Sequence, residues 1–321
     1  MSRRLHHCVA VAAVLFVSIT GHTAERPTAA VSALEQSPEI DGIISEEEWR
    51  GVAILDQPFI QFEPEPGQPS PFRTVVRIAQ TETALYVAIE AHDPNPERLA
   101  AANTRRDGDM GQDDSVVVMV DTFSDRRTGY LFATNLLATQ YDARLADNGR
   151  TVDDLWDAEW RCAAQRTDAG WIAEFEIPFS VLRFRSGDDQ TWGLNFARTV
   201  PRRLETSLWS GPTEDAWRVS SFGTLSGLQL QKRADKTWMA IPYGLAMVND
   251  SGDTNFDVGG DFRGRPSSAS GVDLAVNPDL ALIEAAVEVI NLTRYDLVIP
   301  EKRPFFLEGS ERYSQRIRQF Y

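Results

Sequence analysis

RTVVRIAQTETALYVAIEA, residues 73–91, contains two alternating runs of apolar and polar residues around a polar turn at 80–83. In the second run, Leu85, Val87 and Ile89 fall on one face of an extended chain, because successive side chains of a strand point to opposite faces. Two such runs joined by a short polar segment are typical of a β-hairpin. The sequence therefore predicts a pair of antiparallel strands here.

The same period of two continues from about residue 38 to residue 230. Turn residues separate the further predicted strands, which are 115–122, 128–135, 170–178, 192–200 and 222–230. The first of these, SVVVMVDT, is apolar on both faces and predicts a strand in the middle of a sheet. Many short strands with turns between them predict a mostly β fold, an antiparallel β-sandwich.

Helices are expected at few positions. Ser45 and Glu48 have the S-x-x-E spacing of a capping box, which predicts a short helix with Trp49 pointing inward. One further helical turn is expected in IPFSVLRF, residues 177–184, with a proline near its start.

The first 24 residues differ from the rest of the chain. Arg3 and Arg4 precede an apolar run at 9–19, and small residues follow at Gly21, Thr23 and Ala24. This is the layout of a secretory signal, so residues 1–24 are predicted to be a signal peptide and the protein to be exported to the periplasm, the outer membrane or the outside of the cell. The sandwich is assigned to residues 32–230. The pattern changes after residue 230, so residues 231–321 are assigned to a connector and a partial β-rich region.

Composition excludes several kinds of site. After residue 24 the sequence contains one cysteine, Cys162, and one histidine, His92. A disulfide framework and a zinc site with several His or Cys ligands are therefore excluded. The net charge of −15 disfavours nucleic acid as a partner.

Tryptophan residues are the candidate ligand-binding groups, because aromatic faces stack on the apolar faces of sugar rings. Trp49, Trp171 and Trp192 fall within helix or strand patterns and are predicted to lie in the core. The remaining candidates flank predicted loops or turns, and they are Trp156, Trp160, Trp209 and Trp217. A structural role for these four is the alternative.

Acidic residues suggest two other kinds of chemistry. An acidic loop offers oxygen ligands for calcium, through Asp107, Asp109, Asp113 and Asp114; the alternative is a solvated loop in which Asp114 caps the next strand. Glu174 and Glu176 share the outer face of one predicted strand, about 7 Å apart. Two carboxylates at such a separation are used in glycoside hydrolysis, although a solvated strand face has the same pattern. We interpret the chain as non-catalytic, with a glycosidase as the alternative.

Several motifs occur in an order typical of one family. They include EIDGIISEEEW (39–49), DDSVVVMVDT (113–122), GWIAEFEIPFSVLRF (170–184), WGLNFAR (192–198), VNPD (276–279) and PEKRPFFLEG (300–309). This set resembles bacterial secreted proteins whose N-terminal half is similar to the family 9 carbohydrate-binding module. Their C-terminal half is a domain of unknown function that is thought to be an outer-membrane-type β-barrel.

The resemblance implies a sandwich that binds carbohydrate and acts in polysaccharide catabolism. It also implies an outer-membrane barrel to which the sandwich is attached, either in the same chain, where the barrel is truncated, or in another chain. A sandwich that serves as a plug or docking domain for the barrel is a further alternative. In sugar-binding members, a Trp before the central strand and a Glu on it contact the sugar. Gly111 and Val117 stand near the matching positions of this sequence.

Overall fold

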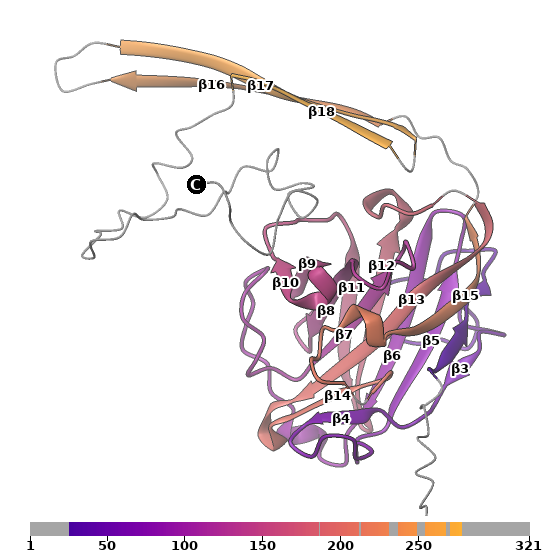
Figure 1. The fold of residues 1–321 in the computed structure, drawn as a ribbon. Helices are drawn as coiled ribbons and strands as arrows, with labels where there is room; N and C mark the ends of the chain where they lie inside the picture. Colours follow the sequence, from indigo (N-terminus) through magenta and orange to yellow (C-terminus); the bar gives the residue numbers. More distant parts are fainter. Residues whose placement is uncertain are drawn as a thin grey trace, which may run out of the picture.

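The protein folds mainly into β-strands, as the sequence predicts (Figure 1). The computed structural model describes residues 26–185, 187–211, 213–230, 237–248, 254–267 and 270–277. The predicted signal peptide, the join at 231–236 and the chain after residue 277 lie outside the described residues. In the described part, no helix is long and apolar enough to cross a membrane.

Sheet A has nine strands in the order β1-β15-β13-β7-β8-β9-β10, with β14 paired to β13 and β4 paired to β14. The strands are β1 (Thr28–Ala30), β4 (Ile60–Glu63), β7 (Ser115–Asp121), β8 (Gly129–Asn135), β9 (Gln140–Ala146), β10 (Thr151–Asp153), β13 (Gly187–Val200), β14 (Glu205–Leu208) and β15 (Gly223–Leu230). Most neighbours are antiparallel, but β1 runs parallel to β15 at the edge of the sheet.

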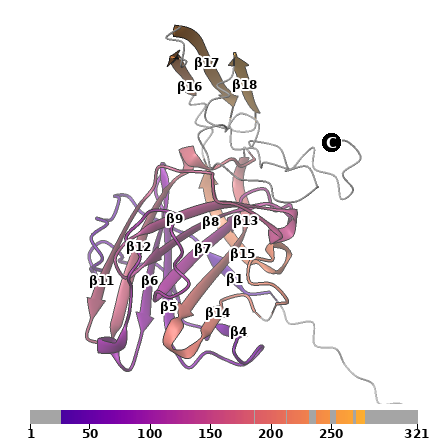
Figure 2. The same ribbon diagram turned by 90° about the vertical axis from the view of Figure 1, so that its left-hand side faces the viewer.

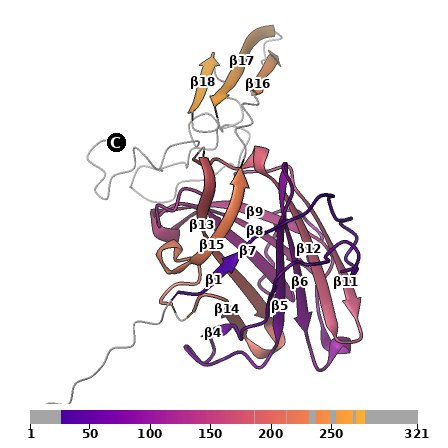
Figure 3. The same ribbon diagram turned by 90° about the vertical axis from the view of Figure 1, so that its right-hand side faces the viewer.

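Sheet B has six strands in the order β11-β12-β6-β5-β2, with β3 also paired to β5. They are β2 (Ser32–Ala33), β3 (Ile54–Leu55), β5 (Thr74–Gln80), β6 (Ala84–His92), β11 (Arg161–Thr167) and β12 (Gly170–Pro178). Figures 2 and 3 show sheets A and B as two facing layers. β5 and β6 form the predicted hairpin, with Val76 opposite Ile89.

Sheet C is a separate antiparallel meander drawn apart from the two layers in Figure 1. It contains β16 (Thr237–Val248), β17 (Thr254–Ser267) and β18 (Ser270–Val276). Five single-turn 3₁₀ segments complete the described elements: η1 (Pro96–Arg98), η2 (Asp147–Gly149), η3 (Phe179–Val181), η4 (Pro201–Arg203) and η5 (Val219–Ser221). The segment η3 is the helical turn expected in IPFSVLRF.

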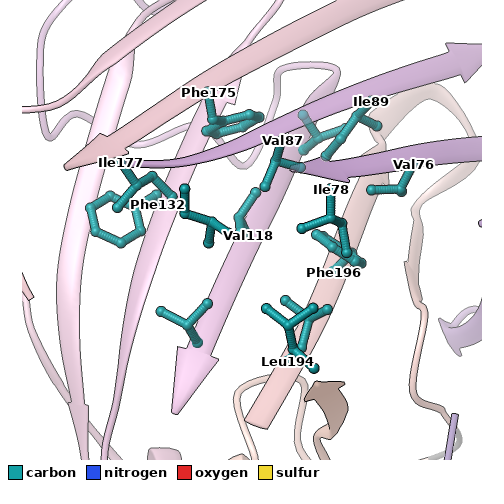
Figure 4. Packing of buried hydrophobic residues seen from close by; sticks show 14 of the residues in the cluster. Val76, Ile78, Val87, Ile89, Val118, Phe132, Phe175, Ile177, Leu194 and Phe196 are labelled. Atoms are coloured by element: carbon teal, nitrogen blue, oxygen red, sulfur yellow. The ribbon is translucent and has the colours of Figure 1, made fainter. Parts of the chain in front are cut away.

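The core lies between sheets A and B and is called the inner cluster here. Val87 of β6, Val118 of β7 and Phe175 of β12 belong to it and come from both layers (Figure 4). Trp171 and Trp192 are also buried in this cluster, as predicted. Each large apolar side chain buried here contributes roughly 1.5–3 kcal/mol, so the facing strands hold each other in place.

Both sheets are covered on their outer faces as well. All seven residues of β7 are buried, which confirms the prediction of a strand in the middle of a sheet. On the outer face of sheet B, Trp49 and Val52 pack against Tyr86 and Ala88. The polypeptide at 34–52 therefore covers sheet B, and Trp49 points inward as predicted.

The helix predicted at Ser45 is wrong, because residues 46–51 form hydrogen-bonded turns. One capping-box contact is present, since the Glu48 backbone N–H donates to Ser45 Oγ at 3.3 Å; the Glu48 carboxylate accepts from the Ser45 hydroxyl, at 2.8 Å. Gly51 follows with φ at +78° and ends the turn. The Trp49 N–H donates to the Ser45 carbonyl at 3.1 Å and the Val52 N–H to the Trp49 carbonyl at 3.2 Å, so the segment forms single turns in place of a regular helix.

Candidate functional site

The outer face of sheet A has a second apolar cluster, called the A-face cluster here. Its strand members are every second residue of neighbouring strands: Val117 and Met119 of β7, Leu131 and Ala133 of β8, Ala143 and Leu145 of β9, Ala197 of β13, and Leu208 of β14. The antiparallel register places Val117 opposite both Ala133 and Ala197. These side chains form a continuous apolar floor.

Four larger residues border this floor and stay partly exposed: Phe62, Met110, Tyr141 and Trp217. Tyr141 comes from β9, where it lies opposite Ala133. Met110 and Trp217 come from two loops, which bring them from distant parts of the sequence to one face. The floor residues themselves are buried, so the partly exposed aromatic residues on the border are the groups that can stack on a flat apolar ligand surface.

The segment 213–222 carries Trp217 and packs on the A-face cluster through Val219 and Phe222. Before this segment, Asn195 Oδ1 accepts a hydrogen bond from the Ser210 backbone N–H at 2.9 Å. Asp215 Oδ1 accepts one from the Trp217 backbone N–H at 3.0 Å. The position of Trp217 is therefore set by a held segment and not by a loose loop.

Charged groups lie around this border. Burial raises the pKa of Tyr141, and the nearby carboxylates of Asp154 and Asp107 raise it further. On the 213–221 segment, Arg218 forms an ion pair with Glu214. A shallow depression is lined by Arg26, Thr213, Glu214, Arg218, Ser220 and Ser221. Acidic groups that could bind hydroxyls therefore lie near Tyr141, and a separate set of polar side chains lies on the segment that carries Trp217.

Two of the four predicted ligand-binding tryptophans are core residues. Trp160 is 5% exposed and stacks on Phe175, with ring centroids 5.7 Å apart. Its Nε1 donates to Asp142 Oδ1 at 3.0 Å. Trp209 is 2% exposed and packs against Phe196. Both side chains fill the space between the sheets and are closed to a ligand.

Trp156 is partly exposed, but it is not beside Trp217. It packs against the inner cluster, with its ring 5.0 Å from Tyr130 and 5.9 Å from Phe132, whereas Trp217 packs against the A-face cluster. The two clusters lie on opposite faces of sheet A. The four predicted tryptophans therefore do not line a common site, and Trp217 is the member that lies on the outer face.

The predicted calcium ligands do not form a cation site. Asp113 is buried and accepts hydrogen bonds from the backbone N–H groups of Ala102 and Asn103 and from Asn135 Nδ2. Asp114 is also buried, accepts from the Ala100 N–H, and lies 3.8 Å from the Arg202 guanidinium. Both carboxylates therefore hold the loop that leads into β7.

The other two aspartates of this loop have separate partners. Asp109 Oδ1 accepts from the Gly111 N–H at 2.8 Å, and Asp107 pairs with Arg106. Within the described residues, no group of three or more His, Cys, Asp or Glu side chains could hold a metal ion. Calcium therefore does not fit the oxygen atoms that the sequence suggested.

Glu174 and Glu176 alternate with core residues of β12, as predicted, but Glu174 is not solvated. It is 0% exposed, because residues 38–49 lie over it. Its carboxylate accepts hydrogen bonds from the Gly42 N–H at 2.8 Å, the Asp41 N–H at 3.2 Å and Trp49 Nε1 at 3.1 Å. Burial raises the pKa of Glu174 to about 7. This carboxylate fastens the covering segment to sheet B.

Glu176 has a different environment from Glu174. It accepts hydrogen bonds from the Tyr86 hydroxyl at 3.2 Å and from the Arg161 side chain on the neighbouring strand. The two carboxylates considered for glycoside hydrolysis are thus engaged in contacts within the sandwich. A substrate could reach both of them only if the segment 38–49 moved away from the outer face of sheet B.

The sequence interpretation did not select Tyr141, Met110 or Phe62. For Tyr141 a signal exists, since QYDARLA alternates with Tyr141, Ala143 and Leu145 on one face. Met110 and Phe62 reach the border through tertiary folding of loops, and a local pattern does not reveal them.

The fold and the site define a two-layer β-sandwich with an aromatic-bordered outer face. The chain belongs to the family described as carbohydrate family 9 binding domain-like, whose model matches residues 40–229, more than half of the chain. No curated protein is significantly similar to this chain.

Solved structures show related folds. A family 9 carbohydrate-binding module from Caldicellulosiruptor kristjanssonii in complex with glucose is 22% identical, with a TM-score of 0.47 over 66% of this chain and 99% of that one. The same kind of module with cellotriose is 23% identical, with a TM-score of 0.47 over 65% and 96%. A putative carbohydrate-binding protein from Bacteroides uniformis is 16% identical, with a TM-score of 0.51 over 63% and 99%.

We predict that Glu174 makes stability depend on pH. Its folded-state pKa of about 7 lies above the ordinary 4.5, so the folded protein holds a proton in this range that the unfolded chain releases. The carboxyl therefore favours the folded state most below pH 4.5, and this contribution is lost as the pH rises through about 7. The shift corresponds to about 3 kcal/mol.

Urea unfolding of the wild type and of Glu174→Gln at several pH values tests this. The free energy of unfolding of the wild type, relative to that of the variant, should fall by about 3 kcal/mol between pH 4.5 and pH 7. A difference that stays constant over this range would contradict the burial of a titrating Glu174.

Proposed function

We propose that this protein is a non-catalytic carbohydrate-binding module that binds glycan on the outer face of sheet A. The observation that carries the proposal is the position of Trp217 and Tyr141, partly exposed on the border of a buried apolar floor. Membership of the family 9 binding domain-like family supports it. The names of the glucose and cellotriose complexes make β-glucan fragments the first ligands to test.

The chemistry of the floor indicates how a glycan would bind. Val117 and Ala133 are apolar, but each is less than a tenth exposed, so a sugar ring would stack by its C–H face on the partly exposed border residues Trp217 or Tyr141. Hydrogen bonds would come from the border, where Asp107 and Asp154 lie near Tyr141. Few hydrogen bonds to the ring give weak selection between epimers. We therefore expect modest affinity and tolerance for different sugars.

We predict that Trp217→Ala lowers the affinity for cellotriose about tenfold, since aromatic stacking contributes roughly 1.5 kcal/mol. Trp156→Ala is the matched control, because Trp156 is also partly exposed but packs on the inner cluster. Isothermal titration calorimetry should give the wild-type affinity for Trp156→Ala.

Thermal unfolding of both variants checks that each still folds. Equal losses of affinity in Trp217→Ala and Trp156→Ala would contradict the outer-face site, and a loss in Trp156→Ala alone would move the site to the edge of the inner cluster. Absence of binding by the wild type to cellotriose, xylan and cellulose would contradict the carbohydrate proposal itself.

We further propose that sheet C contacts lipid as part of an outer-membrane-type barrel and that residues 1–24 direct export. The support for lipid contact is an exposed apolar face. Phe256 and Val258 are 79% and 74% exposed, and Phe262 and Leu274 pair on the same face. The strands β16 and β17 have 12 and 14 residues, and about 9–11 residues suffice for a tilted strand to cross the hydrocarbon core.

Flotation of the full chain with phosphatidylethanolamine and phosphatidylglycerol vesicles tests the lipid proposal. We expect the wild type to float, and Phe256→Asp/Val258→Asp to stay in the soluble fraction, because charges on a lipid-facing strand are unfavourable. Asp261→Asn is the control, since Asp261 alternates to the other face of β17. A wild type that does not float, or flotation that all three proteins share, would contradict the proposal.

A further inference from the structure

We propose that the η2 turn, through Asn148 and Gly149, is a positioning element that fixes Trp217 for glycan binding. The proposal rests on the function proposed above and adds residues that lie outside the expected ligand contacts. It follows from two close approaches between this turn and the segment that carries Trp217.

The first approach is a hydrogen bond from the segment to the turn. Asn148 Oδ1 accepts from the Ser220 backbone N–H at 2.7 Å, although 72 residues separate the two positions in sequence. Asn148 has φ at +63° and ψ at +37°, a left-handed conformation that Asn adopts more readily than most residues. Asn thus supplies both the backbone shape and the side-chain acceptor that this contact requires.

The second approach is a backbone contact at Gly149. This residue is buried and has φ at +87°. A Cβ atom here would lie 2.1 Å from the carbonyl oxygen of Trp217 and 2.6 Å from its carbonyl carbon. The main chain of Trp217 therefore lies directly against the turn, and a side chain larger than that of glycine would push the segment away from the sheet.

The turn itself is anchored to sheet A. It joins β9 to β10, which pair with each other, and the Asn148 N–H donates to the Arg127 carbonyl at 2.9 Å just before β8. An ion pair between Arg150 and Asp147 spans the turn at 3.0 Å. The segment with Trp217 is thus fastened to the same sheet whose outer face forms the floor.

Such fastening matters for binding because a ligand loses affinity when it must first order the group it stacks on. With the turn in place, Trp217 is already held at the border of the floor before a glycan arrives. Loss of one neutral hydrogen bond should weaken binding about fivefold, with the effect mainly on the dissociation rate.

Asn148→Gly is the informative variant, because glycine keeps the left-handed backbone and removes the acceptor. Asn148→Asp retains an acceptor for the Ser220 N–H and should rescue the wild-type behaviour. Gly149→Ala tests the backbone contact. Hydrogen–deuterium exchange of residues 217–221 reports how firmly the segment is held, and calorimetry with cellotriose reports binding.

We expect Asn148→Gly to exchange faster at 217–221 and to bind cellotriose about fivefold more weakly, while its melting temperature stays within a few degrees of the wild type. Asn148→Asp should match the wild type in both measurements. Unchanged exchange in Asn148→Gly, or faster exchange with unchanged affinity, would overturn the positioning role.

The same measurements separate this inference from the proposed function. If the wild type binds none of the glycans, the carbohydrate proposal fails, whereas faster exchange at 217–221 in Asn148→Gly would still show that the turn fixes Trp217. If the wild type binds and Gly149→Ala leaves both exchange and affinity unchanged, the backbone contact has no positioning role.

Discussion

The structure depends on one constraint. The central strands of both sheets are apolar on both faces, so each sheet must be covered on its inner face and on its outer face. The strand β7 shows this most clearly, with Val116, Val118 and Val120 in the inner cluster and Val117 and Met119 in the A-face cluster. The inner faces cover each other. The outer faces need other parts of the chain, because apolar area left in water costs roughly 25 cal/mol for each Å².

The two covers are built differently, and the difference bears on function. Over sheet B, the segment 34–52 is fastened by the buried carboxylate of Glu174 and closes the face. Over sheet A, the cover comes from separate loops, and Tyr141 and Trp217 keep partial exposure. The incompletely closed face is where a ligand can reach aromatic side chains. The η2 turn then links the sandwich framework to the residue that would touch the ligand.

The strands could be predicted from the sequence because period-two alternation is a local property. This alternation predicts the β5–β6 hairpin and the buried strand β7. It also predicts that Glu174 lies on the face of β12 that points away from the core between the sheets. The site could be predicted less well, because it depends on which distant segment covers which face. Trp160 has the loop setting of a ligand-binding residue, yet stacks on Phe175. Likewise, Asp113 belongs to an acidic loop, yet its carboxylate oxygens accept hydrogen bonds from N–H donors of the protein.

The central claim is that the partly covered outer face of sheet A, and not the space between the sheets, receives the ligand. The most direct measurement is a crystal structure of the protein grown with cellotriose. The account predicts sugar electron density on the outer face of sheet A, against the side chain of Trp217 or of Tyr141. Density beside Trp156, or against the outer face of sheet B after displacement of residues 38–49, would contradict it.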